Sequence, residues 1–107
     1  MRGLTAPRSR SRWMSYELRF RKEAKKEWDA LSATIRSQLK KQLAERLENP
    51  RVPAGRLHGA KNRYKIKLRS SGYRLVYEVR DMELIGAVVA VGRRERNSVY
   101  RAAARRE

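Results

Sequence analysis

The sequence contains no cysteine and a single histidine, and these absences exclude several kinds of site. Without cysteine there is no disulfide scaffold, no zinc ribbon and no thiol nucleophile. One histidine, His58, supports neither a two-histidine ribonuclease mechanism nor a histidine-rich metal site. The carboxylates do not cluster as a magnesium site requires, and no glycine-rich phosphate loop or G-x-S-x-G elbow is present. We therefore expect no metal and no other cofactor, and a conventional enzyme is disfavoured.

Long apolar runs are also missing. No stretch reaches the roughly 18 apolar residues that a membrane span requires. The first 13 residues are rich in arginine and serine but lack the apolar core of a secretory signal. We expect a cytoplasmic protein with no membrane partner. Residues 1–13 are expected to be a basic arm, disordered or outside the native domain, ahead of one domain over residues 14–107.

Acidic residues are scarce. The 107 residues include 11 Asp and Glu against 28 Lys and Arg, for a formal net charge of +17. A protein with this balance attracts polyanions and repels other cations. Nucleic acid is the first partner to consider, and an acidic protein is the second.

The first half of the chain changes period. Residues 16–20 alternate apolar and charged side chains, which predicts a strand, and the apolar spacing over 24–31 predicts a short helix. Ser32 can cap a second helix, in which apolar residues recur every fourth position over 35–47. Asn49-Pro50 ends that helix, since the residue before proline is pushed out of the helical region. Two helices with a short join favour a helical hairpin.

The second half predicts three strands and a final helix. Residues 64–68 and 73–79 alternate, and 84–91 is almost wholly apolar, as in a strand that is covered on both faces. An alanine-rich stretch over 94–106 predicts a short helix. The order is β-α-α-β-β-β-α. We expect an α+β domain, a small twisted antiparallel sheet with an N-terminal helical hairpin and a short C-terminal helix.

Cations gather in the second half. No acidic residue occurs in the 29 positions between Glu48 and Glu78. That window holds Arg51, Arg56, Lys61, Arg63, Lys65, Lys67, Arg69 and Arg74, and Arg93, Arg94 and Arg96 follow before Tyr100. Strand alternation aims Lys65, Lys67 and Arg69 at one face, where cations and a tyrosine would suit a phosphate groove. The alternative is an ordinary solvated face, although such faces usually mix charges of both signs.

Such a groove could support one unconventional reaction, the cleavage of RNA without a metal. A lysine among other cations loses its proton more readily and can act as a base. Arginine suits the charge of a pentavalent phosphate because its guanidinium is a planar fork of donors. Protonation of the leaving 5′-oxygen is the weakest step, because arginine is a poor acid.

Several segments resemble the RelE family of bacterial toxins. Residues 64–77 (YKIKLRSSGYRLVY) and 91–100 (VGRRERNSVY) carry the resemblance most strongly, and it extends over roughly residues 15 to 104. It implies a RelE/ParE-like fold and a toxin that enters the A site of the 70S ribosome. There the toxin would cut mRNA without a metal, by 2′-OH attack that leaves a 2′,3′-cyclic phosphate.

The resemblance also implies roles for individual residues. Lys65 and Lys67 would supply the base and phosphate contacts, Arg74 would stabilise the transition state, and Arg94 would serve the leaving group. Tyr100 would stack on or orient the cleaved nucleotide. Contacts with mRNA or ribosomal RNA are expected from Arg56, Lys61, Arg63, Arg69, Arg93 and Arg96. The remaining implied partner is a cognate acidic, RelB-like antitoxin. His58 replaces an arginine of the family pattern, which weakens any expectation about contacts of that loop with ribosomal RNA.

Two other functions remain open at this point. A ParE-like relative would share the fold and inhibit DNA gyrase without cutting RNA. A non-catalytic RNA-binding module would use the basic groove for docking alone, and would tolerate Arg94→Lys or Tyr100→Phe with little effect.

Overall fold

The structure is a computed structural model that describes residues 15–93, 95 and 98–106. The element order matches the predicted β-α-α-β-β-β-α. The elements are strand β1 (Glu17–Phe20), helices α2 (Lys22–Asp29) and α3 (Ala33–Glu48), the 3-10 turn η1 (Pro53–Gly55), strands β2 (Arg63–Leu68), β3 (Tyr73–Arg80) and β4 (Ile85–Arg93), and helix α4 (Ser98–Arg105). The predicted arm, residues 1–13, lies outside the described residues, so the arm and the domain limits stay predictions.

The strands form one sheet in the order β1-β4-β3-β2. The pairs β2–β3 and β3–β4 are antiparallel, as the short turns between them require. Strand β1 lies parallel to β4, with Leu18 opposite Gly86. The sheet is therefore mixed, and the prediction of a wholly antiparallel sheet was wrong for this one pair. The reason is topological. No hairpin joins β1 to a neighbour, and the chain crosses one face through α2 and α3 before it enters β2 in the same direction as β1.

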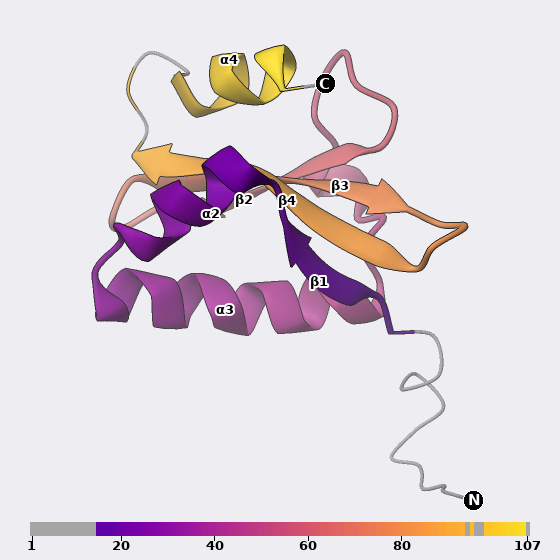
Figure 1. Cartoon of the computed structure of the whole chain (residues 1–107), viewed down its shortest axis with the longest axis horizontal. Coiled ribbons are helices and arrows are strands. Elements are labelled where there is room, and N and C mark those ends of the chain that lie inside the picture. Colours follow the sequence, from indigo (N-terminus) through magenta and orange to yellow (C-terminus); the bar gives the residue numbers. More distant parts are fainter. Residues whose placement is uncertain (1–14, 94, 96–97, 107) are drawn as a thin grey trace, which may run out of the picture.

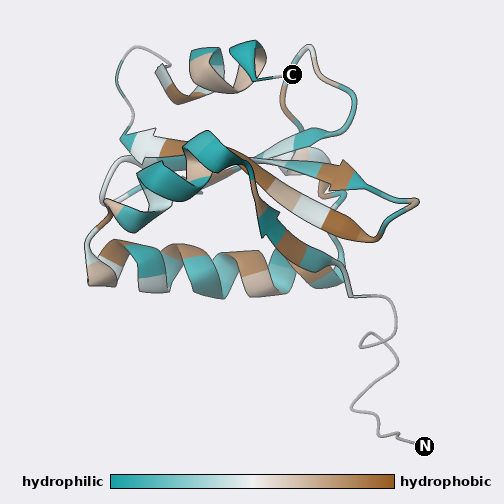
Figure 2. Cartoon of the chain, in the orientation of Figure 1, coloured by the Kyte–Doolittle hydropathy of each residue, from teal (hydrophilic) through white to brown (hydrophobic). Residues whose placement is uncertain are grey.

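Helices α2 and α3 pack on one face of the sheet and form the larger core. The hydroxyl of Ser32 accepts a hydrogen bond from the Ile35 amide at 3.3 Å, which confirms the predicted cap of α3. Leu39 and Leu43, one turn apart on α3, are buried against the sheet. Figure 2 shows α3 in alternating brown and teal, as expected for a helix with one apolar side.

Helix α4 lies on the opposite face, above the sheet in Figure 1. It covers a second core made of Val76, Val89, Ala90, Val99 and Ala103. Tyr77 lies opposite Val88 and Val76 lies opposite Ala90, so Val89 is the extra residue of a β-bulge. The bulge brings Val89 and Ala90 together into the core under α4. Strand β4 is therefore buried on both faces, as its unbroken apolar run predicts.

Side chains complete the edge of β4 beyond the end of β1. The pairing with β1 ends at Phe20 opposite Val88. Further on, the Glu27 carboxylate accepts from the Val91 amide at 3.2 Å, and Arg106 donates to the Val89 carbonyl at 3.0 Å. Arg106 and Glu27 also form an ion pair at 2.9 Å. This edge is thus satisfied without another strand, and α2 is tied to the chain after α4.

Arg63 holds the C-terminal end of α4. The residue is 7% exposed, and its Nη1 and Nη2 donate to the carbonyls of Ala103 at 2.5 Å and Arg106 at 2.6 Å. Its Nε lies 3.5 Å from Glu78 Oε2. The last carbonyls of a helix have no partner within it, and a cation there is favoured by the helix dipole. Arg63 is therefore a structural link between β2 and α4.

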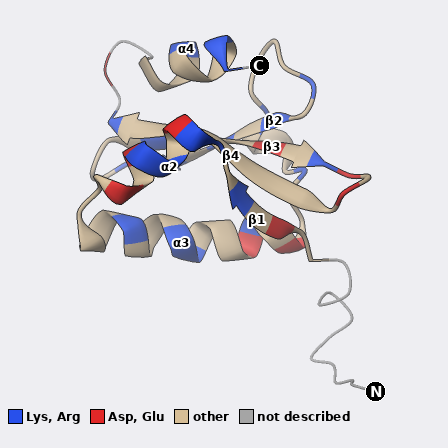
Figure 3. Cartoon of the chain, in the orientation of Figure 1, with Lys and Arg blue, Asp and Glu red and all other residues tan. Residues whose placement is uncertain are grey.

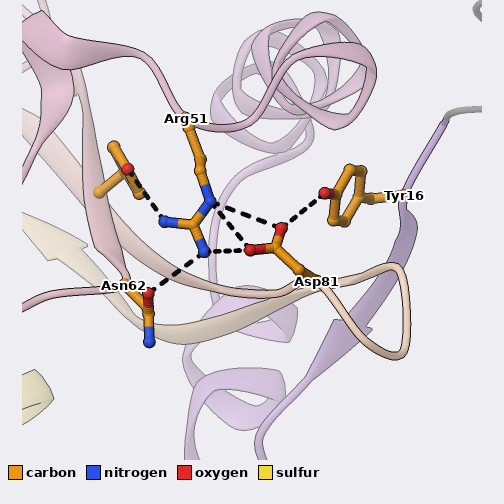
Figure 4. Close-up of polar contacts among 5 residues, drawn as sticks. Tyr16, Arg51, Asn62 and Asp81 are labelled. Atoms are coloured by element: carbon orange, nitrogen blue, oxygen red, sulfur yellow. Dashed lines mark hydrogen bonds and ion pairs between the residues drawn. The ribbon is translucent and has the colours of Figure 1, made fainter.

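A second polar network joins the start of β1, the segment after α3 and the β3–β4 turn (Figure 4). Arg51 Nη2 donates to Asp81 at 2.6 Å, and the Tyr16 hydroxyl donates to the same carboxylate at 2.6 Å. Arg51 also donates to Asn62 and to the Tyr64 hydroxyl. The hydrogen bond from Arg51 holds the pKa of Asp81 below its ordinary value, and that from Tyr16 acts in the same direction.

Among the described residues, no helix has both the length and the apolar character needed to cross a membrane.

The Asp81 network predicts an acid-dependent loss of stability. Because the folded pKa of Asp81 is lowered, its contribution is present above the unfolded pKa and is lost as pH falls through the folded pKa. We expect Asp81→Asn to lower the Tm at neutral pH, and the difference from the unaltered protein to shrink between about pH 5 and pH 3. Thermal unfolding across this range is the measurement. A difference that stayed constant with pH would contradict the role of the Asp81 charge.

Because Arg63 links β2 to α4, we expect its replacement to lower the stability of the fold more than replacement of the neighbouring Arg80 does. Arg63→Gln removes the donors of two helix-end carbonyls, and an unpaired buried acceptor costs about 1–3 kcal/mol. We expect the free energy of unfolding to fall by about that amount and amide exchange in α4 to accelerate. Arg80→Gln is the matched control, since Arg80 contacts the same Glu78 from an exposed position at 3.2 Å. Equal effects of the two changes would refute the link.

Candidate active site

The face of β2 and β3 beside α4 carries three cations, Lys65, Lys67 and Arg74, which we call the cationic row. Lys67 lies directly opposite Arg74, and Lys65 lies opposite Val76, so all three belong to one face. Strand alternation predicts the shared face of Lys65 and Lys67; Arg69, the third residue predicted there, lies just beyond the end of β2. Helix α4 packs against β4 and β3 on this side of the sheet.

Arg74 is the buried member of the row. It is 8% exposed, and its Nη1 donates to the Tyr73 carbonyl at 3.1 Å. Within the part of the chain that the structure describes, Arg74 has no carboxylate partner. Gly92 lies opposite Arg74 in β4, and a Cβ on Gly92 would lie 3.5 Å from Val99 of α4. The first turn of α4 therefore lies beside the strand position opposite Arg74, whose side chain donates to one carbonyl among the described residues.

Tyr100 projects from the first turn of α4 toward the row. Its ring centroid lies 5.9 Å from Lys65 Nζ, a cation–π distance. Its hydroxyl is buried and has no hydrogen-bond partner among the described residues. A buried hydroxyl without a partner is uncommon and costs free energy, which suits a group that a ligand would satisfy.

The other residues with predicted RNA contacts are placed in different surroundings. Lys61 is exposed in the loop before β2 and lines a hollow of about 380 Å³ together with His58 and Tyr100. Arg56 lies at the start of that loop and Arg69 just after β2, both exposed.

Two predicted residues do not join the row. Arg63 shares its face but is buried in the link to α4. Arg93 pairs with Tyr73 in the sheet, and its guanidinium lies 5.8 Å from that ring, on the opposite face from Arg74. Arg94 and Arg96 lie outside the described residues. The structure thus brings Lys65, Lys67, Arg74 and Tyr100 together.

One cation next to the row was missed by the sequence patterns. Arg46 of α3 reaches the outer edge of β2, where its Nη1 donates to the Lys65 carbonyl at 3.2 Å. Helical spacing carried a signal, because Arg46 follows Leu43 by three positions and Leu39 by seven, which places it on the core side of α3. An arginine on the apolar side of a helix could have been singled out on that ground.

The acidic side chains are distributed unevenly around the row: those of the β3–β4 turn lie far from it, whereas Glu78 shares its face of the sheet and Glu95 lies between β4 and α4. Figure 3 shows red on the β3–β4 turn, which holds Asp81 and Glu83 at the opposite end of β3 from Arg74. Glu78, the acidic residue within β3, faces Arg63 and Arg80. The field at the row is therefore positive, and a polyanion is the ligand that it favours. No group of three or more Asp, Glu or His side chains among the described residues could hold a metal ion.

Comparisons with known proteins all point to toxins of type II toxin–antitoxin systems. Residues 18–98 match the family model described as the ParE toxin of the type II toxin–antitoxin system parDE. The mRNA interferase toxin RelE of Escherichia coli is 54% identical over 93 residues, which cover 87% of this chain and 98% of that protein.

Solved structures give the same result. The isolated E. coli RelE toxin aligns with a TM-score of 0.74 at 52% identity, covering 86% of this chain and 98% of that one. The toxin in the intact E. coli RelBE toxin–antitoxin complex aligns with a TM-score of 0.73 at 53% identity, covering 76% and 99%. Fold, length and sequence agree over nearly the whole of these relatives, and the chain belongs to the RelE family of type II toxin–antitoxin toxins.

Proposed function

We propose that this protein is a ribosome-dependent endoribonuclease, a toxin that cleaves mRNA in the ribosomal A site and thereby inhibits translation. The ribose 2′-OH attacks the adjacent phosphorus, the bond to the 5′-oxygen breaks, and the products are a 2′,3′-cyclic phosphate and a 5′-hydroxyl. A cognate acidic, RelB-like antitoxin neutralises the toxin. The toxin acts in the cytoplasm, where ribosomes and mRNA meet.

The observation that carries this proposal is the environment of Arg74. An arginine that is 8% exposed and has no carboxylate partner among the described residues is a costly feature in a stable fold. An anion whose negative charge increases during a reaction would offset the free-energy cost of burying this arginine. A phosphate passing through a pentavalent state is such an anion, and a positioned arginine stabilises it more than it stabilises the starting diester.

The neighbours of Arg74 supply the other roles. Lys67 lies opposite it across the strand pair, so both can contact one phosphate. Lys65, next along the face, contacts the Tyr100 ring. One of the two lysines accepts the proton of the 2′-OH while the other contacts the phosphate, and Tyr100 stacks on or orients the nucleotide. Arg94 serves the leaving group.

Dependence on the ribosome follows from what the site contains. Its donors are cations, and arginine is a poor acid for the leaving oxygen. Such a site gains most when the RNA is already held with its 2′-OH in line with the scissile bond. The ribosome supplies that positioning, so free mRNA is a poor substrate.

Gyrase inhibition is the main alternative, and the description of the matching family model as ParE toxin favours considering it. An inhibitor that cuts nothing has no use for the combination of Lys65, Lys67, Arg74 and Tyr100. The identity to mRNA interferases, 54% over 98% of such a relative, also supports the nuclease.

The nuclease function predicts cuts that depend on both the ribosome and the arginines. We expect primer extension of a defined mRNA in a purified translation system to show cuts inside the A-site codon only when ribosomes are present. Arg74→Ala and Arg94→Ala should each lower the cleavage rate about 100-fold or more, because each removes stabilisation of developing charge.

The matched control is Arg19→Gln, which removes a cation from β1 at the other edge of the sheet. Unchanged cleavage in the control would show that the losses do not reflect net charge. Equal cutting of ribosome-free mRNA would refute the ribosome dependence. If no cut appeared under any condition and gyrase were inhibited instead, the alternative would hold.

Replacement of Tyr100 by Phe should leave stability unchanged or raise it, and should lower activity. Tyr100→Phe keeps the ring beside Lys65 and removes a buried hydroxyl without a described partner, so the Tm should be unchanged or higher. If the hydroxyl binds the substrate, single-turnover cleavage on ribosomes should fall about 10-fold or more, the loss expected from one hydrogen bond of about 1.5 kcal/mol. Full activity in the Phe variant would limit Tyr100 to stacking.

A further inference from the structure

A hollow lies at the outer edge of β2, between the second half of α3 and the turn η1. It measures about 270 Å³. Its polar lining includes Gln42, Arg46, Lys65, Lys67 and Arg69, and no Asp or Glu lines it. We call it the β2-edge hollow. Four cationic residues from a helix, a strand and a turn around one hollow form a concentrated positive site.

Arg46 is held in a fixed orientation in this hollow. Its Nη1 donates to the Lys65 carbonyl at 3.2 Å and to the Tyr77 hydroxyl at 3.0 Å, and its guanidinium carbon lies 5.8 Å from the Tyr77 ring centroid. The Tyr77 hydroxyl in turn donates to the Pro50 carbonyl at 2.6 Å. The Nε and Nη2 groups of Arg46 have no partner among the described residues, so one side of the fork is fixed and the rest is available to a ligand.

Among the residues that the structure describes, Arg46 has no carboxylate partner. It is half-buried, and its partners are a carbonyl and a phenol. Burial raises the pKa of Tyr77 above its ordinary value, against the opposing effect of Arg46, so the phenol stays neutral. A partly buried cation with only neutral partners lacks compensation that an anion would supply.

Gly55 of η1 provides the room that this arginine needs. A Cβ at position 55 would lie 3.0 Å from the Lys65 carbonyl oxygen and 3.1 Å from Arg46 Nη1. Both distances are tighter than ordinary contacts, and the backbone of Gly55 is not in the left-handed region. Glycine therefore matters here for space, because it lets η1 approach β2 while Arg46 lies between them.

The β2-edge hollow is continuous with the cationic row, because Lys65 and Lys67 line the hollow and also belong to the row. A polymer that carries one anionic group on each repeating unit can therefore occupy the row and the hollow at once. We infer that the hollow binds a backbone phosphate of the RNA strand, next to the nucleotide being cleaved, with Arg46 as its principal donor. This inference rests on the proposed function and adds a second phosphate subsite to it.

The experiment measures the binding of a short single-stranded RNA to the full chain by fluorescence anisotropy over a series of salt concentrations. The slope of log K against log salt is negative, and Arg46→Gln should reduce its magnitude by about 0.7, the value for one phosphate contact on a single strand. Gly55→Ala should reproduce most of this change without altering the charge. Arg46→Lys should keep the slope and weaken the affinity, because the charge remains while the fork is lost.

Lys40→Gln is the matched control, since it removes one exposed positive charge from the same helix outside the hollow. We expect its slope to equal that of the unaltered protein. If Arg46→Gln proves unstable by thermal unfolding, Arg46→Lys and Gly55→Ala carry the test.

Three results would be decisive. Equal slopes for Arg46→Gln and Lys40→Gln would overturn the inference, as would an effect of Arg46→Gln on the binding of poly-glutamate and not of RNA. A reduced slope for Arg46→Gln, with the slope of Lys40→Gln unchanged, would support it. Because ribosome-dependent cleavage by the unaltered protein is assayed separately, failure of the phosphate subsite and failure of the proposed function can be told apart.

Discussion

Burial of β4 on both faces is the constraint on which the rest of the structure depends. The larger core holds Val88 and Val91, and the smaller core holds Val89 and Ala90, so each face of the strand requires its own helical cover. Helices α2 and α3 meet this need on one side and α4 meets it on the other. Because α4 is short and lies over β3 and β4, the same face of β2 is left for charged side chains. Lys65 and Lys67 of the cationic row lie on this face of β2.

The placement of the acidic side chains explains how so basic a chain folds and still keeps its excess positive charge. Three of the seven ion pairs among the described residues tie separate elements together. They are Arg106–Glu27, Arg63–Glu78 and Arg51–Asp81. Each of these acids is therefore engaged with a structural arginine and is not available to neutralise Lys65, Lys67 or Arg74. The remaining positive charge repels itself, and that repulsion is relieved when a polyanion binds.

Local patterns predicted most of the fold. The alternation over residues 64–68 and 73–79 and the Ser32 cap all correspond to elements of the structure. The parallel pairing of β1 could not be predicted from these patterns, because it is set by a crossover and not by a local turn. The β-bulge at Val89 was hidden as well, since a wholly apolar run shows no period that the bulge could interrupt.

The site was predicted less completely, and arginine shows why. Alternation predicted one face for Lys65, Lys67 and Arg69. The register of β2 and β3 puts Arg63 and Arg74 on the face of the two lysines as well, and only tertiary contacts separate the roles of these arginines. Arg63 donates hydrogen bonds to two carbonyls at the end of α4, and the carboxylate of Glu78 compensates much of its charge. Arg74, on the next strand, is equally buried and has one carbonyl. A buried arginine with satisfied donors stabilises the fold. One with donors left over among the described residues suits an anion, as we propose for Arg74 and for the half-buried Arg46.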